Sequence, residues 1–471
     1  MQFTVATNWD PELIEQLAKL PVRDIYGVAN HSIVGSGRPS IIVSEVSEDA
    51  IADYIKKVHE KKIQFSYLLN APCMNNQEYD KKYHRKLIDY IQWISDIGAD
   101  SVTVSIPLLI QMIKEQFPKL KIRVSTISHV NSVNRAKLYM QLGADEITPD
   151  VMINRDFKTL EKMQKALHGK CELDLLLTDG CLYQCPFRHY HYNILGHASQ
   201  TFQEFDRYYI DTCILNCSII KFSNPTEVIK ARWIRPEDLS HYEALGIKYF
   251  KIAGRRMSTD WILRAVKAFS ERKYDGNLID IIQGFDISFG GIEKKDPNAR
   301  FAESIGKEQT ANLVIDNTKL DGFIDFFKKQ NCLAMCDECN YCEEWAKKAV
   351  VRNEKAAEEY VASIKSYMDD IVSSREFGIK SDRIEDKKKT GIDWNAETQK
   401  IFDELIQKSP PQFQSIAKMM VSSLAEGNAR GRNSPLVENQ DLVKAFLEGT
   451  PGPFQAEMRE NLQKYGFEIA T

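Results

Sequence analysis

Residues 142–150 read LGADEITPD, a glycine followed by a short apolar run, and the same arrangement returns at 97–105 (IGADSVTVS) and at 245–254 (LGIKYFKIAG). In each copy a helical pattern precedes the glycine. A glycine at that point supplies the left-handed cap that ends a helix before the chain turns back into a sheet. The repeated arrangement therefore predicts helices that alternate with parallel strands.

Strand-like and helical patterns alternate over much of the first half of the chain. Strand patterns occupy 22–29, 63–69, 101–107, 121–128, 145–149 and 171–178, with helical patterns between them. Counting through residues 249–254 gives about eight strands, which favours a closed barrel over an open doubly wound sheet. No G-x-G-x-x-G follows the first strand, which further disfavours a dinucleotide-binding sheet. The expected fold is α/β, a TIM-like (β/α)8 barrel followed by a cysteine-rich segment and a small all-helical C-terminal domain.

The pattern changes three times after the barrel. We expect the barrel over residues 1–275, an extension with cysteines over 276–345, a charged helix and linker over 346–390, and a helical domain over 391–471. Residues 284–304 are rich in glycine and aspartate and are typical of a loop, whereas 374–391 are polar and basic enough for a linker. Pro410–Pro411 and Ser434–Pro435 should divide the last domain into short helices.

The composition of the 471 residues excludes several classes of protein. A net charge of −4 gives no general attraction to nucleic acid or anionic lipid, although a local basic patch would still allow RNA binding. There is no apolar run of about 18 residues, so no membrane span is predicted. The first residues lack the basic and apolar regions of a secretory signal, and we expect a cytoplasmic protein.

Ten cysteines in such a chain indicate metal or redox use rather than disulfides. Eight of them fall into two groups of four, whereas Cys73 and Cys171 stand apart and are expected to be small buried hydrophobic residues. This clustering is the strongest indication of chemistry in the sequence.

The first group consists of Cys181, Cys185, Cys213 and Cys217, two Cys-x3-Cys pairs separated by 27 residues. Four thiolates suit either a tetrahedral zinc ion or a [4Fe–4S] cluster, and the absence of Cys-x-x-Cys knuckles favours the cluster. The group follows the sixth predicted strand, which places it at the mouth of the barrel. The histidines between the pairs are ligands, proton donors or polar loop residues: His189, His191 and His197.

The second group consists of Cys332, Cys336, Cys339 and Cys342. Its compact spacing resembles ferredoxin-type ligation more than a zinc finger, and structural zinc remains the alternative. The first three also match the spacing of radical S-adenosylmethionine enzymes, but that motif normally follows the first strand of a barrel. Negative charges surround the group and would lower the reduction potential of a cluster: Asp337, Glu338, Glu343 and Glu344.

Polar residues follow the predicted strands, where barrel enzymes carry their sites. Any one of them could simply cap the next helix, but as a set they should line a pocket. They are Asn30, His31, Asn70, Ser105, Ser128, His129, Asn131, Asp150, Asp179, Lys251, Arg255 and Arg256. No hydrolytic motif accompanies them, because the chain lacks both H-E-x-x-H and G-x-S-x-G.

Three segments resemble peptidase family U32. They are RPEDL at 235–239, EALGIKYFKIAGRRMSTDWILRAVKAF at 243–269, and VSTISHVNSVNRAKLYMQLGADEI at 124–147. The resemblance covers roughly residues 1 to 270. Ala253 departs from it, since the family usually has glutamate there, and the first cysteine pair is closer together than in many members.

The resemblance implies a barrel whose [4Fe–4S] cluster is held by the first cysteine group. The family name refers to a collagenase-like protease activity. Its better understood members take part in dioxygen-independent hydroxylation of the ubiquinone ring, or of uridine and cytidine in RNA, and some draw the hydroxyl group from prephenate. Lys251 and Arg255 would then bind a carboxylate-rich donor. The expected catalytic set is His129, Asn131, Lys251 and Arg255.

The C-terminal module resembles, more loosely, the helical domain that ends the light-independent protochlorophyllide reductase B subunit. The similarity includes Trp394, Pro411, Phe413, Ala429 and the segment 437–446.

Three functions follow from these interpretations. The leading one is an iron–sulfur enzyme of anaerobic metabolism that modifies a small aromatic molecule or RNA. The alternatives are a collagenase-like peptidase and a scaffold that delivers clusters or substrate. One or two [4Fe–4S] clusters are expected, with zinc as the alternative at Cys332–Cys342. The expected partners are a small-molecule or RNA substrate and another family member in a hetero-oligomer.

Overall fold

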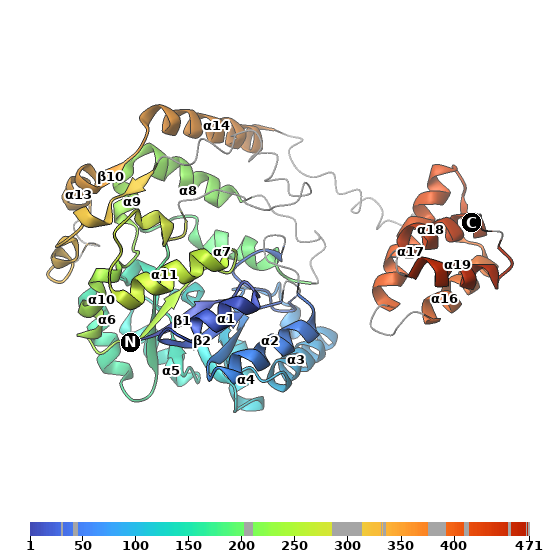
Figure 1. Cartoon of the computed structure of the whole chain (residues 1–471), viewed down its shortest axis with the longest axis horizontal. Coiled ribbons are helices and arrows are strands. Elements are labelled where there is room, and N and C mark those ends of the chain that lie inside the picture. The colour runs from blue at the N-terminus through green and yellow to red at the C-terminus, as the bar shows by residue number, and fades with distance from the viewer. Residues whose placement is uncertain are drawn as a thin grey trace. The chain divides into compact units, whose positions relative to one another are not determined.

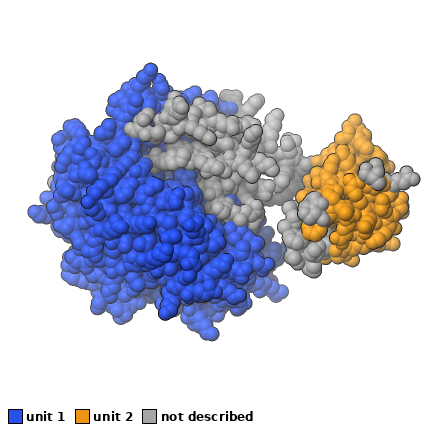
Figure 2. All heavy atoms as spheres, in the orientation of Figure 1, with its two compact units in different colours: residues 1–377 blue, residues 378–471 orange. Residues whose placement is uncertain are grey.

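The computed structural model describes residues 1–29, 32–40, 46–201, 211–284, 313–330, 332, 336–374, 392–408, 414–450, 454–467 and 469. The chain forms two compact units, Met1–Phe377 and Gly378–Thr471 (Figure 2). Nearly all of the predicted loop at 284–304 and of the linker at 374–391 lies outside the described residues, as do Asn30, His31 and Pro410–Pro411.

Eight parallel strands close into a barrel in the first unit, in the order of the sequence (Figure 1). They are β1 (Gln2–Ala6), β2 (Val22–Gly27), β3 (Gln64–Leu69), β4 (Ser101–Val104), β5 (Lys121–Val124), β6 (Glu146–Ile147), β7 (Glu172–Leu176) and β8 (Tyr249–Ile252). The barrel is closed because β1 pairs with β2 on one side and with β8 on the other. The predicted (β/α)8 barrel is confirmed.

Helices follow the strands and cover the barrel. They are α1 (Pro11–Leu17), α2 (Glu48–Glu60), α3 (Lys81–Asp96), α4 (Pro107–Gln116), α5 (Val133–Gln141), α6 (Phe157–Leu167), α10 (Leu239–Glu243) and α11 (Thr259–Glu271). Gly98, Gly143 and Gly246 have φ angles of 88°, 109° and 89°. The three predicted glycine caps therefore adopt the left-handed conformation that turns each helix back toward a strand.

The eight strands agree with the count from the sequence, but the predicted position of the first cysteine group after the sixth strand is wrong. Gln2–Ala6 forms β1. The cysteine stretch, residues 181–217 with the first cysteine group, therefore follows the seventh strand, β7, and not the sixth. The five residues Gln2–Ala6 carry no local sequence signal that marks them as a strand. The side chains from Phe3 to Ala6 are nevertheless fully buried, which the barrel requires.

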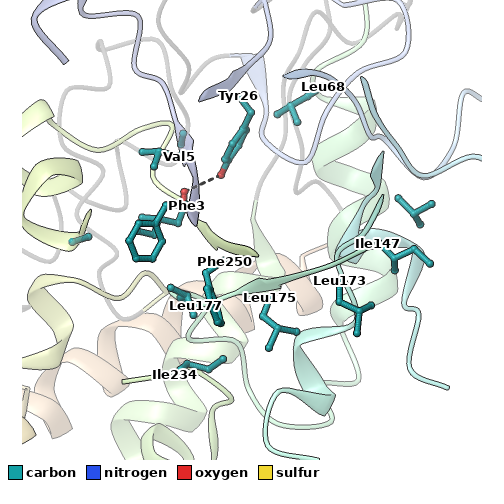
Figure 3. Close-up of a cluster of buried hydrophobic side chains, with 14 of the residues drawn as sticks. Phe3, Val5, Tyr26, Leu68, Ile147, Leu173, Leu175, Leu177, Ile234 and Phe250 are labelled. Carbon is teal, nitrogen blue, oxygen red and sulfur yellow. Dashed lines mark hydrogen bonds between the residues drawn. The ribbon is translucent and has the colours of Figure 1, made fainter. Parts of the chain in front are cut away.

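The two faces of the strands have different chemistry. Apolar side chains such as Phe3, Leu175 and Phe250 belong to the hydrophobic core (Figure 3). The barrel interior is ionic, because Asp24 of β2 binds Arg123 of β5, a strand that is not its neighbour in the sheet. Asp24 and Arg123 can meet only across the inside of the barrel, where apolar branched side chains usually dominate.

The segment after β7 and the extension pack together on the barrel. Helices α7 (Arg188–His197), α8 (Thr212–Ser223) and α9 (Pro225–Lys230) follow β7, and α13 (Tyr341–Ala349) and α14 (Glu354–Ser373) follow the second cysteine group. Helix α14 lies beside α8 (Figure 1), where the rings of Phe222 and Tyr360 are 4.9 Å apart. Strand β9 (Val314–Ile315), before the second cysteine group, pairs antiparallel with β10 (Val350–Val351), which follows α13. The buried side chains of the extension belong to the same hydrophobic core as the barrel.

The second unit contains α16 (Ala396–Lys408), α17 (Gln414–Gly431), α18 (Asn439–Gly449) and α19 (Gln455–Gln463). It has a core of its own, which includes Phe402, Val421 and Phe446. The unit is helical as predicted, but a short parallel pair, β11 (Asp393–Trp394) and β12 (Leu436–Val437), departs from the all-helical expectation. The side chain of Val437 is fully buried in the core, and Trp394 packs against Phe402 at 5.0 Å, so both strands are held by the same helix layer. Among the described residues, no helix is long and apolar enough to cross a membrane.

Candidate functional site

The first cysteine group lies at the carboxyl end of the barrel. Cys181 and Cys185 are in the loop after β7, and Cys213 and Cys217 are one turn apart on α8, where residues four apart share a face. All four line one cavity of about 200 Å³. Asp179 fixes the start of the loop by accepting a hydrogen bond from the Cys181 amide at 3.0 Å. The fold therefore gathers four thiols from two separate elements at one cavity.

Residues at the carboxyl ends of other strands also line this first cavity. Lys251 of β8 and Arg255 after it line the cavity, together with Tyr26 of β2. The Lys251 ammonium lies 4.3 Å from the centre of the Tyr26 ring, and Arg255 donates to the Ser36 hydroxyl at 3.1 Å. Two of the four residues of the predicted catalytic set thus lie beside the cysteines.

The first cavity is rich in positive charge. Among the described residues, two carboxylates line it, Asp179 and Asp211. The cations that line it are Arg38, Arg188, Lys221, Lys251, Arg255 and Arg256. Burial, together with the charge of Arg38, lowers the pKa of Arg255 to about 9. Burial also lowers the pKa of Lys251. Such a cavity is suited to an anionic occupant, since its cations outnumber its carboxylates.

Two buried cations stand close to the thiols. Burial raises the pKa of the Cys181 thiol, and so does the charge of Asp179, whereas Arg188 and Lys221 act in the opposite direction. Lys221 is buried and donates to the carbonyl oxygen of Gly284 at 2.5 Å. A [4Fe–4S] cluster with four thiolate ligands carries net negative charge, which Arg188 and Lys221 would balance. The donor set and the charge around it therefore fit such a cluster.

A second cavity of about 460 Å³ adjoins the first and shares Cys185 and Arg188 with it. His129 and Asn131 line this second cavity and not the first. The predicted catalytic set is thus divided between the two cavities. His129 forms a hydrogen bond to Asp150 at 3.0 Å through Nδ1.

The remaining predicted residues are distributed as follows. Asn70, Asp179 and Arg256 line the first cavity, and Asp150 lines the second. Ser105 and Ser128 line neither of these two cavities; the Ser105 hydroxyl donates to the carbonyl oxygen of Asn70 at 2.9 Å. Asn30 and His31 lie outside the described residues.

The three histidines of the cysteine stretch have different surroundings. His191 lines the first cavity and hydrogen-bonds to Asp211 at 3.0 Å. His189 lines the second cavity, where its ring centre is 4.0 Å from that of His129. His197 lines neither of them.

The second cysteine group is gathered at a third and much smaller cavity. Cys332, Cys336, Cys339 and Cys342 all line this space of about 20 Å³. Burial raises the pKa of Cys342 to about 11, against the charges of Arg155 and Arg232. The space is close to the minimum for one water molecule and is too small for a four-iron cube in the arrangement seen here. In volume the space suits one zinc ion better than a cluster, and the choice between the two stays a prediction.

Ligand-type side chains do not converge on a single ion anywhere in the part of the chain that the structure describes. Tetrahedral zinc needs its thiolates about 2.3 Å from one centre. A cube holds its thiolates on four separate irons, and they stand farther apart. This finding holds for both cysteine groups, since all eight thiols belong to described residues.

Comparison with known proteins identifies the family. The model of peptidase family U32 matches residues 38–173. The uncharacterized protease MJ1657 of Methanocaldococcus jannaschii is 30% identical over 322 residues, which cover 67% of this chain and 86% of that protein. The chain belongs to peptidase family U32. Among solved structures, the U32 peptidase Mk0906 is similar with 15% identity and a TM-score of 0.42, over 54% of this chain and 93% of that one.

The match to the U32 family model ends before either cysteine group. Residues 38–173 include β3 to β6 and the start of β7, whereas both cysteine groups and Arg255 follow that span. The site of this U32 protein therefore has to be argued from its own residues.

Sequence reasoning missed several residues of the U32 site. Lys221 could have been found, because it lies one helical turn after Cys217, just as Cys217 lies one turn after Cys213. Arg188 lies within the cysteine stretch but had no distinguishing neighbour. Arg38 and Arg232 carried no signal, because only the folded chain brings them to the cavities.

Proposed function

We propose that this U32 protein is an iron–sulfur enzyme that modifies a small aromatic molecule or RNA by hydroxylation without dioxygen. One observation carries the proposal: four thiols from two elements share a cavity with Lys251 and Arg255 at the carboxyl ends of the barrel strands. Barrel enzymes place their chemistry at that end.

The residues of the first cavity have separate tasks in this proposal. Cys181, Cys185, Cys213 and Cys217 would hold a [4Fe–4S] cluster, which supplies one-electron transfer when bound. A full set of four thiolates leaves no iron open for a substrate, so electron transfer or structural support is the role that suits it. Arg255 and Arg38 would bind the carboxylates of an organic donor, as guanidinium groups do well.

The balance of the reaction follows from these roles. A C–H bond of the substrate becomes C–OH, and the substrate loses two electrons. The organic donor gives up a hydroxyl oxygen and takes up the same two electrons. Lys251 is buried beside the Tyr26 ring with a lowered pKa, so it is suited to exchange a proton with the donor at Nζ.

The test begins with anaerobic purification of the full chain. We expect a brown protein with about four to eight irons per chain, according to the ligand count of one or two clusters. Candidate aromatic substrates and RNA are then supplied with a carboxylate-rich hydroxyl donor under argon, and the hydroxylated product is measured by mass spectrometry. A colourless protein that contains zinc alone would overturn the proposal.

A peptidase is the second candidate, supported by the name of the family and of the M. jannaschii relative. The observation that favours it is the His129–Asp150 pair, which lines the second cavity with the thiol of Cys185. Burial, however, raises the pKa of Cys185, and an activated thiol needs a lowered one. Cleavage of gelatin by iron-free protein, lost in His129→Ala, would favour this candidate over the hydroxylase.

A further inference from the structure

The second cavity connects the two cysteine groups. It shares Cys185 and Arg188 with the first cavity, and Arg232 and Cys332 with the third. The proposed hydroxylation makes no use of Arg232. Arg232 nevertheless lines the second cavity.

Arg232 is a buried cation whose donors are not satisfied. It is 3% exposed, and its guanidinium lies 3.7 Å from the centre of the Tyr183 ring. Its Nε and Nη1 atoms are buried and have no hydrogen-bond partner among the described residues. Buried polar groups in proteins are almost always paired, because an unpaired charged donor loses its hydration without compensation. Arg232 lines the second cavity, so an anion bound there would compensate this buried charge.

The neighbouring groups cannot serve as acceptors for Arg232. Arg155 is also buried; its guanidinium donates to the carbonyl oxygens of Ile229 and Trp233, and burial together with the charge of Arg232 lowers its pKa to about 10. Asp150 is bound by Arg188 and His129. Asp156, the other carboxylate of this cavity, accepts from the amide and hydroxyl of Thr159 at the start of α6.

We propose that the second cavity is a binding site for a small organic oxyanion, a carboxylate or a phosphate, held by Arg232. A guanidinium presents paired N–H donors that match both kinds of oxyanion. The volume of about 460 Å³ lies in the range of small-molecule sites. Further donors face the same space: His129, Asn131, Arg135, Arg188 and His189. This site is separate from the proposed hydroxylation, because it concerns binding alone.

The position of Arg232 also suggests a rival role. Arg232 lines the third cavity, and its charge acts on Cys342, so it could serve only as the counter-charge of a metal at the second cysteine group. The two roles make different predictions. A ligand anchor controls anion binding, whereas a counter-charge controls metal content.

The test measures binding of inorganic phosphate and of succinate to the full-length protein by isothermal titration calorimetry. Arg232→Met keeps an apolar stem over Tyr183 but removes the charge, and it should weaken binding of at least one anion by about tenfold or more. Arg232→Lys should lose less. Arg264→Met is the matched control, because Arg264 is exposed on α11, and it should bind as the native protein does. The probe that binds more tightly distinguishes a carboxylate from a phosphate ligand.

Metal analysis of the same variants completes the test. The proposal expects Arg232→Met to keep the metal content and the melting temperature of the native protein within a few degrees. Anion binding that is absent or unaffected by Arg232→Met would overturn it, as would loss of metal with anion binding retained. Binding of an RNA oligonucleotide that depends on Arg232, without binding of either small anion, would also overturn it. Because the titrations need no turnover, failure of the hydroxylation assay leaves this result intact.

Discussion

Arg188 and Asp150 form a buried ion pair in the wall between the first two cavities, with only 5% and 6% of their side chains exposed. The other Asp150 oxygen accepts from His129. Burial alone would raise the pKa of Asp150, but the hydrogen bond from His129 and the charge of Arg188 hold it at about 2. Since Arg188 is the first residue of α7 and Asp150 follows β6, the pair fastens the cysteine stretch to the barrel.

The first prediction concerns this pair. Arg188→Met leaves the Asp150 carboxylate buried without its strongest partner, and we expect a loss of about 3–5 kcal/mol in the free energy of unfolding. Urea denaturation measures it. Lys165→Met breaks the exposed pair between Lys165 and Glu161 on α6 and should leave the urea midpoint unchanged. A midpoint for Arg188→Met that equals that of Lys165→Met would show that the buried pair does not stabilise the fold.

Much of the barrel could be predicted from local patterns. Helix ends at Gly98, Gly143 and Gly246 follow from the backbone freedom of glycine, and each strand that follows them is buried in the barrel. The strand that was missed, Gln2–Ala6, acquires its meaning only from pairing with β8, almost 250 residues later. Such long-range pairing leaves no mark in the local sequence.

The site could be predicted in part. The spacing of the cysteines predicted one shared site, and Cys181, Cys185, Cys213 and Cys217 do line one cavity. Lys251 lies in the same cavity, as expected for a residue at the carboxyl end of a barrel strand. The same expectation could not separate residues that lie on either side of an inserted helix. Arg188 at the start of α7 lines both cavities, whereas His129 after β5 and Asp150 after β6 line the second one alone.

A second prediction concerns pH. Asp174 of β7 is fully buried with neither oxygen hydrogen-bonded, and burial, helped by the charge of Glu146, raises its pKa to about 7. A carboxyl whose folded pKa is raised contributes stability below its unfolded pKa of about 4 and loses it as pH rises through about 7. Asp174→Asn does not titrate. Between pH 5 and pH 8, the free energy of unfolding of Asp174→Asn should therefore rise by up to about 3 kcal/mol relative to that of the native protein.

Urea midpoints at the two pH values check the Asp174 prediction. Asp89→Asn, at an exposed position of α3, serves as the control and should follow the native pH dependence. Parallel pH profiles for Asp174→Asn and the native protein would contradict the assignment of this dependence to Asp174.

The third prediction compares two glycines with positive φ. Gly35 (φ 83°) lies in the loop after β2, and a Cβ there would meet the carbonyl oxygen of Gly196 in α7 at 2.8 Å. Gly169 (φ 72°) has no atom within 4 Å of the same position. Gly169→Ala measures the backbone strain alone, about 1–2 kcal/mol, and Gly35→Ala should cost more. Equal urea midpoints for the two variants would show that the loop can move away from α7 without loss of stability.

The fourth prediction concerns the second unit, which has a core of its own. Removing residues 391–471 should leave the melting temperature of the first unit within a few degrees of its native value, with its metal content unchanged. If the C-terminal unit serves to deliver substrate or clusters, product formation should fall while these two quantities stay constant. A first unit that aggregates or melts much earlier would show that the two units depend on each other for stability.

The last prediction separates the two cysteine groups by their metals. The first group surrounds a cavity of about 200 Å³ and the second a space of about 20 Å³, so we expect iron and sulfide at the first and a single zinc ion at the second. Cys181→Ser with Cys213→Ser should remove iron and brown colour and leave zinc. Cys336→Ser with Cys339→Ser should remove zinc and leave iron. Cys73→Ser, which changes a cysteine outside both groups, should keep both metals. Iron lost from both double variants would instead assign a cluster to each group. The loop of the second group would then have to open to hold a cube.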